Sequence, residues 1–180
     1  MNKVLIIIDS GFELIETFSV VDVLRALQIE THICSMNGEL IKSFRDVKIK
    51  CDIAFSDVNA EDYSCIVFPG GPAADELMKN KHLLSFTKSF YEKGKLVAAI
   101  CGGPQILSYA EVVADKRATS HPKVKNNICC KEFIDKPVVV DANVITSQSP
   151  ATALSFAFTI AEALIGKNAC EELKKSFLFQ

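Results

Sequence analysis

The chain has 180 residues, of which 49% are hydrophobic and 23% charged, a composition typical of a single globular domain spanning residues 1–180. Twenty Lys and Arg against 22 Asp and Glu give a net charge of −2, and no segment gathers basic residues, so we expect no nucleic-acid partner. The apolar run at residues 4–8 is too short for a signal peptide or a membrane span, so we expect a cytoplasmic protein without a membrane partner.

Short β-branched runs alternate with longer segments of helical periodicity, which predicts an α/β fold with a parallel sheet between helices. In the first half of the chain we expect strands at residues 3–8, 30–35 and 64–68, helices at 13–27, 73–78 and 82–93, and a hairpin-like excursion over 40–51. The glycines of Pro69-Gly70-Gly71-Pro72, after the third strand, let the backbone pass close to a neighbouring site.

The second half of the chain continues the alternation with shorter pieces. We expect strands at residues 95–100, 117–120, 132–134, 138–141 and 144–147, and helices at 105–113, from Pro150 to a terminating Gly166, and at 169–175. No internal repeat or linker interrupts the pattern, so one domain accounts for the whole sequence.

Cys101 stands between the strand at 95–100 and the helical pattern that follows. In open α/β sheets ligands bind beyond the carboxyl ends of the strands, which is where this thiol falls. A residue in so sharp a strand-to-helix turn adopts strained backbone geometry, and the glycines at 102 and 103 leave room for a substrate. Because a helix N-terminus stabilises a thiolate, we expect a nucleophile elbow at Cys101 with a lowered thiol pKa.

The other six cysteines fit the role of inert, unpaired thiols, because an odd count of seven without regular paired spacing, in a reducing compartment, favours thiols over bridges. The adjacent Cys129 and Cys130 lack the two-residue spacer that lets two thiolates face one ion. The three histidines do not cluster with cysteines or carboxylates at ligand spacing, so we expect no metal site.

Glu16 is the only charged residue on the face of the first helix that also carries Phe12, Val20, Val23 and Leu27. Buried without a cation, its carboxyl would be protonated with a raised pKa and could donate a hydrogen bond to a thiolate. The alternative is a carboxylate stabilised by the start of the helix, a role that Glu13 fits better.

His121 lies in the turn Ser120-His121-Pro122. An imidazole is the side chain best suited to proton transfer near neutral pH, so His121 is a candidate general base. A single loop histidine can equally be an ordinary surface group, and the residues alone leave both interpretations open.

Several segments together resemble the DJ-1/ThiJ/PfpI superfamily, and specifically its DJ-1 branch of protein deglycases and glyoxalases. The segments are residues 11–17, 21–25, 45–47, 68–71, 98–104, 120–122 and 146–147 with Pro150. The resemblance spans nearly the whole chain and implies a flavodoxin-like, class I glutamine amidotransferase-like sandwich. It also implies a homodimer and catalysis without a cofactor or a metal.

The resemblance also implies roles for individual residues. Cys101 corresponds to the elbow cysteine, Glu16 to the protonated acid that hydrogen-bonds it, and His121 to a group close to the sulfur. Gly71 and Gly102 correspond to residues whose backbone N–H groups bind an oxyanion.

The sequence departs from the superfamily patterns at two positions. Peptidase-like members carry a histidine directly after the nucleophile, where this chain has Gly102, so the peptidase triad is absent. Gln148 stands where well-known members of the branch carry an arginine, which leaves Arg45 as the candidate anion- or substrate-binding cation. Glycine rather than alanine at position 102 loosens the elbow without removing its N–H group.

The resemblance and the residues together predict a cysteine-dependent glyoxalase III-type lyase or protein deglycase that protects against oxidative stress. Its expected substrates are glyoxal or methylglyoxal, free or as early adducts on proteins and thiols. The alternative is a redox sensor or chaperone-like stress protein in which Cys101 is oxidised to a sulfinate. A peptidase or amidase would need His121 as its base, and a role in thiamine biosynthesis rests on family naming alone.

Overall fold

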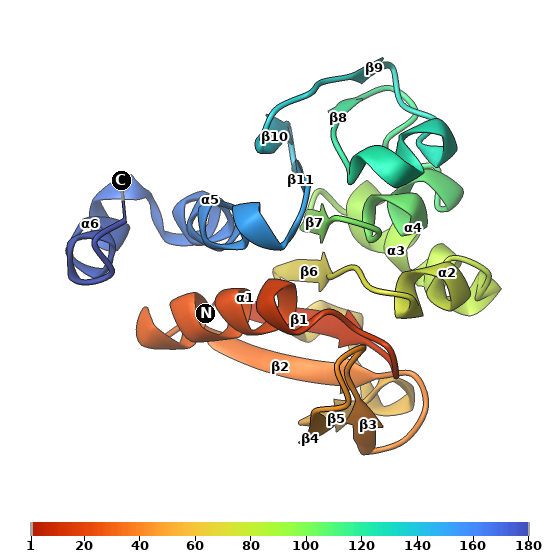
Figure 1. Cartoon of the computed structure of the whole chain (residues 1–180), viewed down its shortest axis with the longest axis horizontal. Coiled ribbons are helices and arrows are strands. Elements are labelled where there is room, and N and C mark those ends of the chain that lie inside the picture. Colours follow the sequence, from red (N-terminus) through yellow and green to blue (C-terminus); the bar gives the residue numbers. More distant parts are fainter. Residues whose placement is uncertain (1, 180) are drawn as a thin grey trace.

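A seven-stranded sheet with helices on both faces forms the centre of the molecule, as the computed structural model of residues 2–179 shows (Figure 1). The strands of this sheet are β1 (Lys3–Ile8), β2 (Glu30–Ser35), β5 (Ile53–Ala54), β6 (Cys65–Phe68), β7 (Leu96–Ile100), β10 (Val138–Asp141) and β11 (Val144–Ser147). Two small two-stranded sheets lie outside it: β3 (Leu40–Lys42) with β4 (Lys48–Lys50), and β8 (Arg117–Ala118) with β9 (Glu132–Phe133).

The strand order is β10-β11-β7-β6-β1-β2-β5, and every neighbouring pair is parallel except β10 with β11. The five central parallel strands therefore follow the flavodoxin-like order, which confirms the predicted fold class. In this topology the strand order reverses between β1 and β6, and the loops after these two strands form the crevice where ligands bind.

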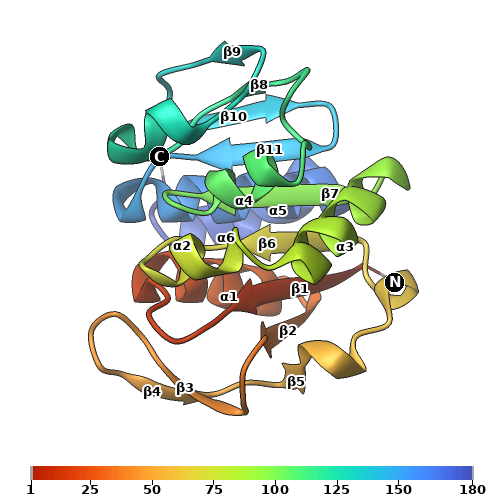
Figure 2. The same cartoon turned by 90° about the vertical axis from the view of Figure 1, so that its right-hand side faces the viewer.

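Within residues 2–179, six α-helices flank the sheet: α1 (Leu14–Ala26), α2 (Ala73–Leu77), α3 (Lys81–Glu92), α4 (Pro104–Tyr109), α5 (Ala153–Ile165) and α6 (Lys167–Ser176). α1, α5 and α6 lie on one side, and α2, α3 and α4 on the other (Figures 1 and 2). The alternation of side chains along β1 explains the two layers, because Val4, Ile6 and Ile8 face one core and Leu5 and Ile7 the other. Both faces of this strand are buried, which is why its sequence is continuously apolar.

The structure corrects four details of the sequence prediction. The helix expected at 105–113 is only the six residues of α4, because the chain turns at Glu111 with a φ of 59°. Arg117 and Ala118 form a strand as expected, but Thr119 donates its N–H to the Thr146 hydroxyl instead of continuing the ladder. Pro150 begins a short 3₁₀ turn before α5, and the two-residue strand β5 carries no strong sequence signal.

The hairpin of β3 and β4 is confirmed, and it packs over the loop that follows β1. The Phe44 N–H donates to the Phe12 carbonyl at 2.8 Å, and the Gly11 N–H donates to the Lys42 carbonyl at 2.7 Å. These bonds place the tip of the hairpin, with Arg45, beside the carboxyl end of the central sheet.

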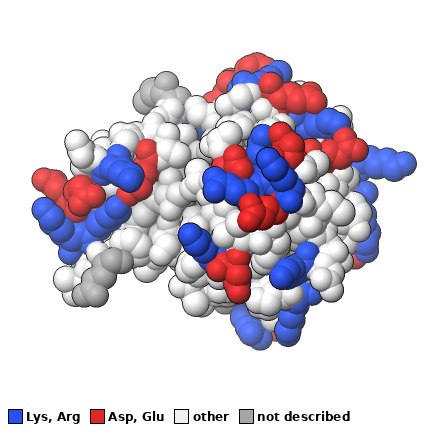
Figure 3. All heavy atoms as spheres, turned by 90° about the horizontal axis from the view of Figure 1, so that it is seen from above, with Lys and Arg blue, Asp and Glu red and all other residues white. Residues whose placement is uncertain are grey.

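Acidic and basic side chains are interspersed on the face seen in Figure 3, with no extended region of one sign. This arrangement agrees with the net charge of −2. Among residues 2–179, no helix combines the length and the apolar character that crossing a bilayer requires.

Candidate active site

The turn at Cys101 has the strained geometry that the sequence predicts. Cys101 directly follows β7 and adopts a φ of 63°, in the left-handed region that residues with a side chain rarely occupy. Its N–H donates to the Ser147 carbonyl and its carbonyl accepts from the His121 N–H, both at 3.0 Å. A Cβ at Gly103 would lie 2.1 Å from the Phe68 carbonyl oxygen, so only glycine allows the chain to turn so sharply beside β6.

Glu16 lies in the first turn of α1 and is completely buried. Its Oε2 accepts a hydrogen bond of 2.7 Å from the Gly70 N–H, whereas its Oε1 has no hydrogen-bond partner within residues 2–179. A Cβ built on Gly70 would lie 2.8 Å from both Glu16 Oε2 and the Cys101 Cβ, so these side chains converge on one side of this glycine. The thiol of Cys101 is within interaction range of the carboxyl.

Burial decides the protonation of this carboxyl. Loss of hydration raises the pKa of Glu16 to about 7, against the stabilising effects of the Gly70 N–H and the Cys101 thiol. Burial, followed by the charge of the Glu16 carboxylate, also raises the pKa of the Cys101 thiol, and the Gly102 N–H opposes this shift. The two groups therefore titrate as a pair that accommodates one negative charge but not two.

These shifts correct the expectation of a lowered thiol pKa at Cys101. That expectation rested on the positive end of the following helix, but α4 has only six residues and the thiol is half-buried beside a carboxyl. Desolvation and the neighbouring carboxylate outweigh the helix, so a thiolate at Cys101 requires that Glu16 keep its proton.

Glu13 fills the role of the helix-start carboxylate. Its Oε2 accepts from the Glu16 N–H at 2.8 Å, which caps α1, and its own N–H donates to the Gly70 carbonyl at 3.1 Å. Because Glu13 supplies the cap, the Glu16 carboxyl is left to point into the protein toward Cys101.

The backbone of Gly71 and Gly102 borders the sulfur from two segments. The Gly71 N–H makes no hydrogen bond within residues 2–179, and the Gly102 N–H interacts with the Cys101 sulfur. Gly71 has a φ of 90°, and a Cβ there would lie 2.4 Å from the Gly11 carbonyl oxygen. A Cβ at Gly102 would meet the Ala74 Cβ at an ordinary 3.4 Å, so this second glycine is not sterically required.

One cavity of about 500 Å³ contains most of the residues expected at the site. Its lining includes Cys101, Gly71, Gly102, His121 and Arg45, and Glu16 lies buried next to the sulfur. The structure therefore brings together every candidate residue that the sequence identified.

His121 and Arg45 reach this cavity in different ways. His121 Nδ1 accepts a hydrogen bond of 3.2 Å from the Lys123 N–H, so the neutral ring carries its proton on Nε2. In this state the ring offers the cavity a donor, which favours a hydrogen-bonding role over the general-base role that the sequence allowed. The Arg45 guanidinium lies 4.6 Å over the ring of Phe44 at the exposed hairpin tip, where it can approach an anionic group.

Sequence reasoning missed a polar network on the floor of this cavity. Gln105, which is 1% exposed, donates from Nε2 to the Asp75 carboxylate and to the Gly102 carbonyl, both at 3.3 Å. Its Oε1 accepts from the Asn127 side chain at 2.7 Å. The only local signal was a polar residue four positions after Cys101 on an otherwise apolar helix face. Gln148, by contrast, donates to Asp135 and does not line the cavity.

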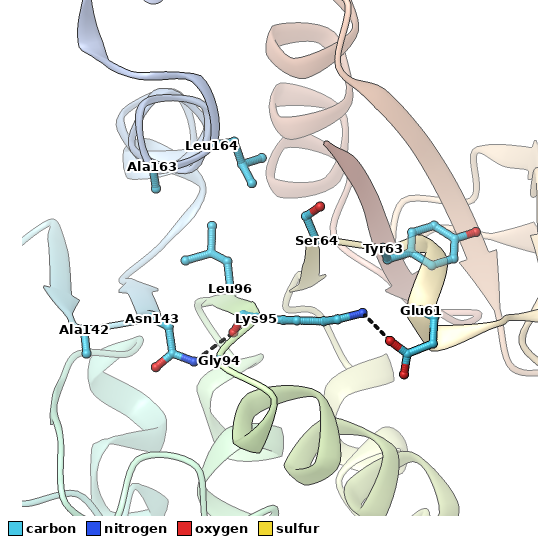
Figure 4. A pocket seen from close by; sticks show the side chains of 10 residues that line it. All are labelled: Glu61, Tyr63, Ser64, Gly94, Lys95, Leu96, Ala142, Asn143, Ala163 and Leu164. Atoms are coloured by element: carbon cyan, nitrogen blue, oxygen red, sulfur yellow. Dashed lines mark hydrogen bonds and ion pairs between the residues drawn. The ribbon is translucent and has the colours of Figure 1, made fainter. Parts of the chain in front are cut away.

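A second cavity of about 590 Å³ lies at the opposite, amino-terminal end of the strands (Figure 4). Lys95 Nζ donates to the Ala60 carbonyl at 2.6 Å and lies 3.6 Å from the Glu61 carboxylate. The Asn143 side chain donates to the Lys95 carbonyl at 2.8 Å. The lining contains no cysteine or histidine, and nowhere in residues 2–179 do three or more His, Cys, Asp or Glu side chains gather as a metal site would need.

Comparisons with known proteins agree with this geometry. The model of the DJ-1/PfpI family matches residues 2–163. Protein dj-1beta of Drosophila melanogaster is 37% identical over 98% of this chain and 97% of its own length, and a deglycase of Pyrococcus horikoshii is 34% identical over 83% and 91%.

Solved structures show the same agreement. The crystal structure of Drosophila DJ-1beta superposes with a TM-score of 0.94 at 35% identity, covering 99% of this chain and 98% of its own. Oxidised Toxoplasma gondii DJ-1 also superposes with a TM-score of 0.94, at 29% identity over 99% of both chains. Taken with the elbow at Cys101 and the buried Glu16, these matches show that the chain belongs to the DJ-1/PfpI family.

Proposed function

We propose that this protein is a cysteine-dependent glyoxalase or protein deglycase that needs no cofactor. Its substrates are glyoxal and methylglyoxal, free or as early adducts on proteins and thiols. One observation carries the proposal: the Cys101 thiol, on a strained turn, faces a buried carboxyl with an unpartnered oxygen and shares its cavity with the Gly71 and Gly102 N–H groups. The relatives named as deglycases support the reaction class.

The reactive state holds one proton on Glu16 and a negative charge on the Cys101 sulfur. Glu16 Oε2 accepts from the Gly70 N–H and the carboxyl interacts with the Cys101 thiol, so a proton kept by Glu16 can be donated to the sulfur. A carboxylic O–H is a much stronger donor than a thiol S–H, which favours the thiolate with a neutral acid over the thiol with a carboxylate. The Gly102 N–H adds to this preference.

The first step is attack of the Cys101 sulfur on the aldehyde carbon, which forms a C–S bond and turns the carbonyl oxygen into an oxyanion. The N–H groups of Gly71 and Gly102 stabilise this charge and Glu16 supplies the proton that makes the hemithioacetal. The proton on the former aldehyde carbon then moves to the adjacent carbon, and the hydroxyl proton moves to the second carbonyl oxygen, which gives a thioester without any external oxidant. Water hydrolyses the thioester to a hydroxy acid and restores the thiol.

His121 and Arg45 act on the rest of the substrate. His121, with its proton on Nε2, donates a hydrogen bond to the second carbonyl oxygen and so assists the proton shift. Arg45 attracts the carboxylate of the developing product, taking the anion-binding role that Gln148 does not fill. A cavity of about 500 Å³ is far larger than methylglyoxal, which leaves room for the amine or thiol part of an adduct.

The test is methylglyoxal consumption, with D-lactate and L-lactate formation, by metal-free protein and by its Cys101→Ser variant. We expect lactate from the unmodified protein and none above background from the variant. Equal activity of the two proteins would refute a cysteine mechanism, and no activity in either would refute the enzyme.

A second function, redox sensing, is favoured by the same unpartnered Glu16 oxygen. Oxidation of the Cys101 sulfur by a peroxide to the sulfinate would give Glu16 Oε1 an oxygen partner, and one of the solved relatives is an oxidised DJ-1. Mass spectrometry after limited peroxide treatment should find two oxygen atoms added at Cys101 alone. The same peroxide treatment of Glu16→Gln separates redox sensing from catalysis. Sensing requires the sulfinate at Cys101 to persist, whereas catalysis is lost when the sulfinate forms.

We also propose that the protein is a homodimer that uses the outer face of α1. Ile15 on this helix is 55% exposed, and Leu154 at the start of α5, 41% exposed, lines a surface cavity together with Phe18 and Val21 of α1. Exposed apolar residues gathered on one face mark an association surface. Light scattering at micromolar concentration should therefore give the mass of two chains.

A cytoplasmic location is proposed on the state of the cysteines. All seven are unpaired, and Cys34 and Cys65 are fully buried in the core, where burial raises the pKa of each thiol. Proteins in oxidising compartments seldom keep so many free thiols.

A further inference from the structure

Gln105 joins three segments that border the sulfur. It lies in the first turn of α4, its Nε2 donates to the Gly102 carbonyl and to Asp75 on α2, and its Oε1 accepts from Asn127. Asn127 ends the 3₁₀ segment Pro122–Asn127, which begins directly after His121. A buried amide with all these partners is held in one orientation, so it fixes the segments relative to one another.

The segment that most needs such a restraint is Gly102. A residue without a Cβ has more backbone freedom than any other, and Gly102 follows a strained Cys101. Its carbonyl accepts from the Gln105 N–H at 3.2 Å and from the Gln105 side chain at 3.3 Å. No steric requirement keeps glycine here, because an added Cβ would meet the Ala74 Cβ at 3.4 Å.

We propose that Gln105 is a positioning residue that holds the Gly102 peptide in place, supplying the restraint that a side chain at position 102 would otherwise provide. Through Asn127 it also keeps the His121 segment against the elbow. Gln105 does not touch the reacting atoms; it holds the Gly102 carbonyl, which limits rotation about the backbone bonds of residue 102 and so keeps the Gly102 N–H directed at the sulfur. The inference rests on the proposed function only in assigning that N–H to the stabilisation of the thiolate and the oxyanion.

The test is a double-mutant cycle between positions 105 and 102, read by the rate at which iodoacetamide alkylates Cys101 across a pH series. Gln105→Met keeps the length of the side chain but removes its hydrogen bonds. We expect alkylation at neutral pH to slow about tenfold and its midpoint to move to higher pH, because a misaimed N–H no longer stabilises the thiolate. In a Gly102→Ala background the same change should slow alkylation about twofold or less, because the added Cβ restrains the peptide.

Thr87→Val is the matched control. Thr87 is also fully buried, and its hydroxyl donates to the Leu83 carbonyl at 2.8 Å on α3, away from the cavity. Thr87→Val should lower the melting temperature about as much as Gln105→Met does, and it should leave the alkylation profile of Cys101 unchanged. The proposal is wrong if Gln105→Met behaves like Thr87→Val. It is also wrong if Gln105→Met slows Cys101 alkylation by the same factor with Gly and with Ala at position 102.

Asn127→Ala covers the case in which Gln105→Met does not fold. This change removes only the bond to Gln105 Oε1, so we expect a smaller slowing that Gly102→Ala again relieves, and equal slowing in both backgrounds would overturn the proposal. Alkylation needs no turnover of a dicarbonyl. A wild-type protein that shows the coupling but produces no lactate would refute the proposed reaction and leave the positioning role standing.

Discussion

The two ends of the central sheet carry cavities of similar size, about 500 Å³ and 590 Å³, but with opposite chemistry. At the amino-terminal end (Figure 4), the side chains of Lys95 and Asn143 donate hydrogen bonds to backbone carbonyls of the fold. At the carboxyl end, the Gly71 N–H and Glu16 Oε1 have no partner within residues 2–179, and a thiol stands beside them. Of these two cavities the smaller one holds the unpaired polar groups, so it is these groups rather than volume that identify the site.

Glycine substitutions provide the strongest contrast between the two ends. Gly71→Ala should destabilise the fold by about 3 kcal/mol and lower kcat about 100-fold, because its Cβ would collide with the Gly11 carbonyl and displace the proposed oxyanion donor. Gly94→Ala, at the other cavity, should cost about 1 kcal/mol and leave kcat unchanged, because its φ is also positive but the space is open.

Urea denaturation and steady-state kinetics on both variants measure this difference. If Gly71→Ala precipitates, its fraction of soluble protein compared with that of Gly94→Ala gives the stability order. Similar losses of stability and kcat in Gly71→Ala and Gly94→Ala would show that the close contact at Gly71 does not matter.

The pH dependence of stability tests the buried acid at the carboxyl end. Because the pKa of Glu16 is raised to about 7, the folded protein keeps a proton that the unfolded chain loses near pH 4.5. The free energy of unfolding therefore falls as pH rises from about 4.5 to about 7, and above pH 7 the loss due to Glu16 is roughly 3 kcal/mol. The lost stability returns as pH falls. Glu16→Gln, which can still accept from the Gly70 N–H, should abolish this dependence.

Urea unfolding at a series of pH values measures the effect. The variant should match the wild type in acid and exceed it in stability above neutral pH. A wild-type protein that instead gains stability through this range, relative to Glu16→Gln, would show that the carboxyl is ionised in the fold.

The smallest functional effect is expected at the amino-terminal cavity. Lys95→Met removes the hydrogen bond to the Ala60 carbonyl and should lower the free energy of unfolding by about 1–2 kcal/mol. It should leave both kcat and the alkylation of Cys101 unchanged, because its cavity lies at the far end of the strands. A change in either quantity, measured in the same assays, would mean that the two ends are linked.

The parts of this site that could be predicted are those whose signal lies within a short stretch of the sequence. The run from β7 into Cys101, Gly102 and Gly103 marks the elbow, and Glu16 interrupts an otherwise apolar helix face. Gln105 could not be predicted to join Asp75 and Asn127, because these residues are 30 and 22 positions away and only the folded chain brings them together.

The thiol pKa was mispredicted for a related reason. A helix that follows a cysteine is visible in the sequence, but the depth of burial and the distance to Glu16 are properties of the fold. Similarly, the Lys123 N–H that fixes the His121 tautomer is a local contact whose geometry no residue pattern encodes.

The central claim is that Glu16 keeps its proton so that Cys101 can carry the charge, and the pH profile of Cys101 alkylation in wild type and Glu16→Gln tests it most directly. If the claim holds, Glu16→Gln moves the wild-type midpoint upward, because an amide is a weaker donor to the thiolate. If Glu16 is instead an ionised carboxylate that repels the thiolate, its removal moves the midpoint downward, which would contradict the claim.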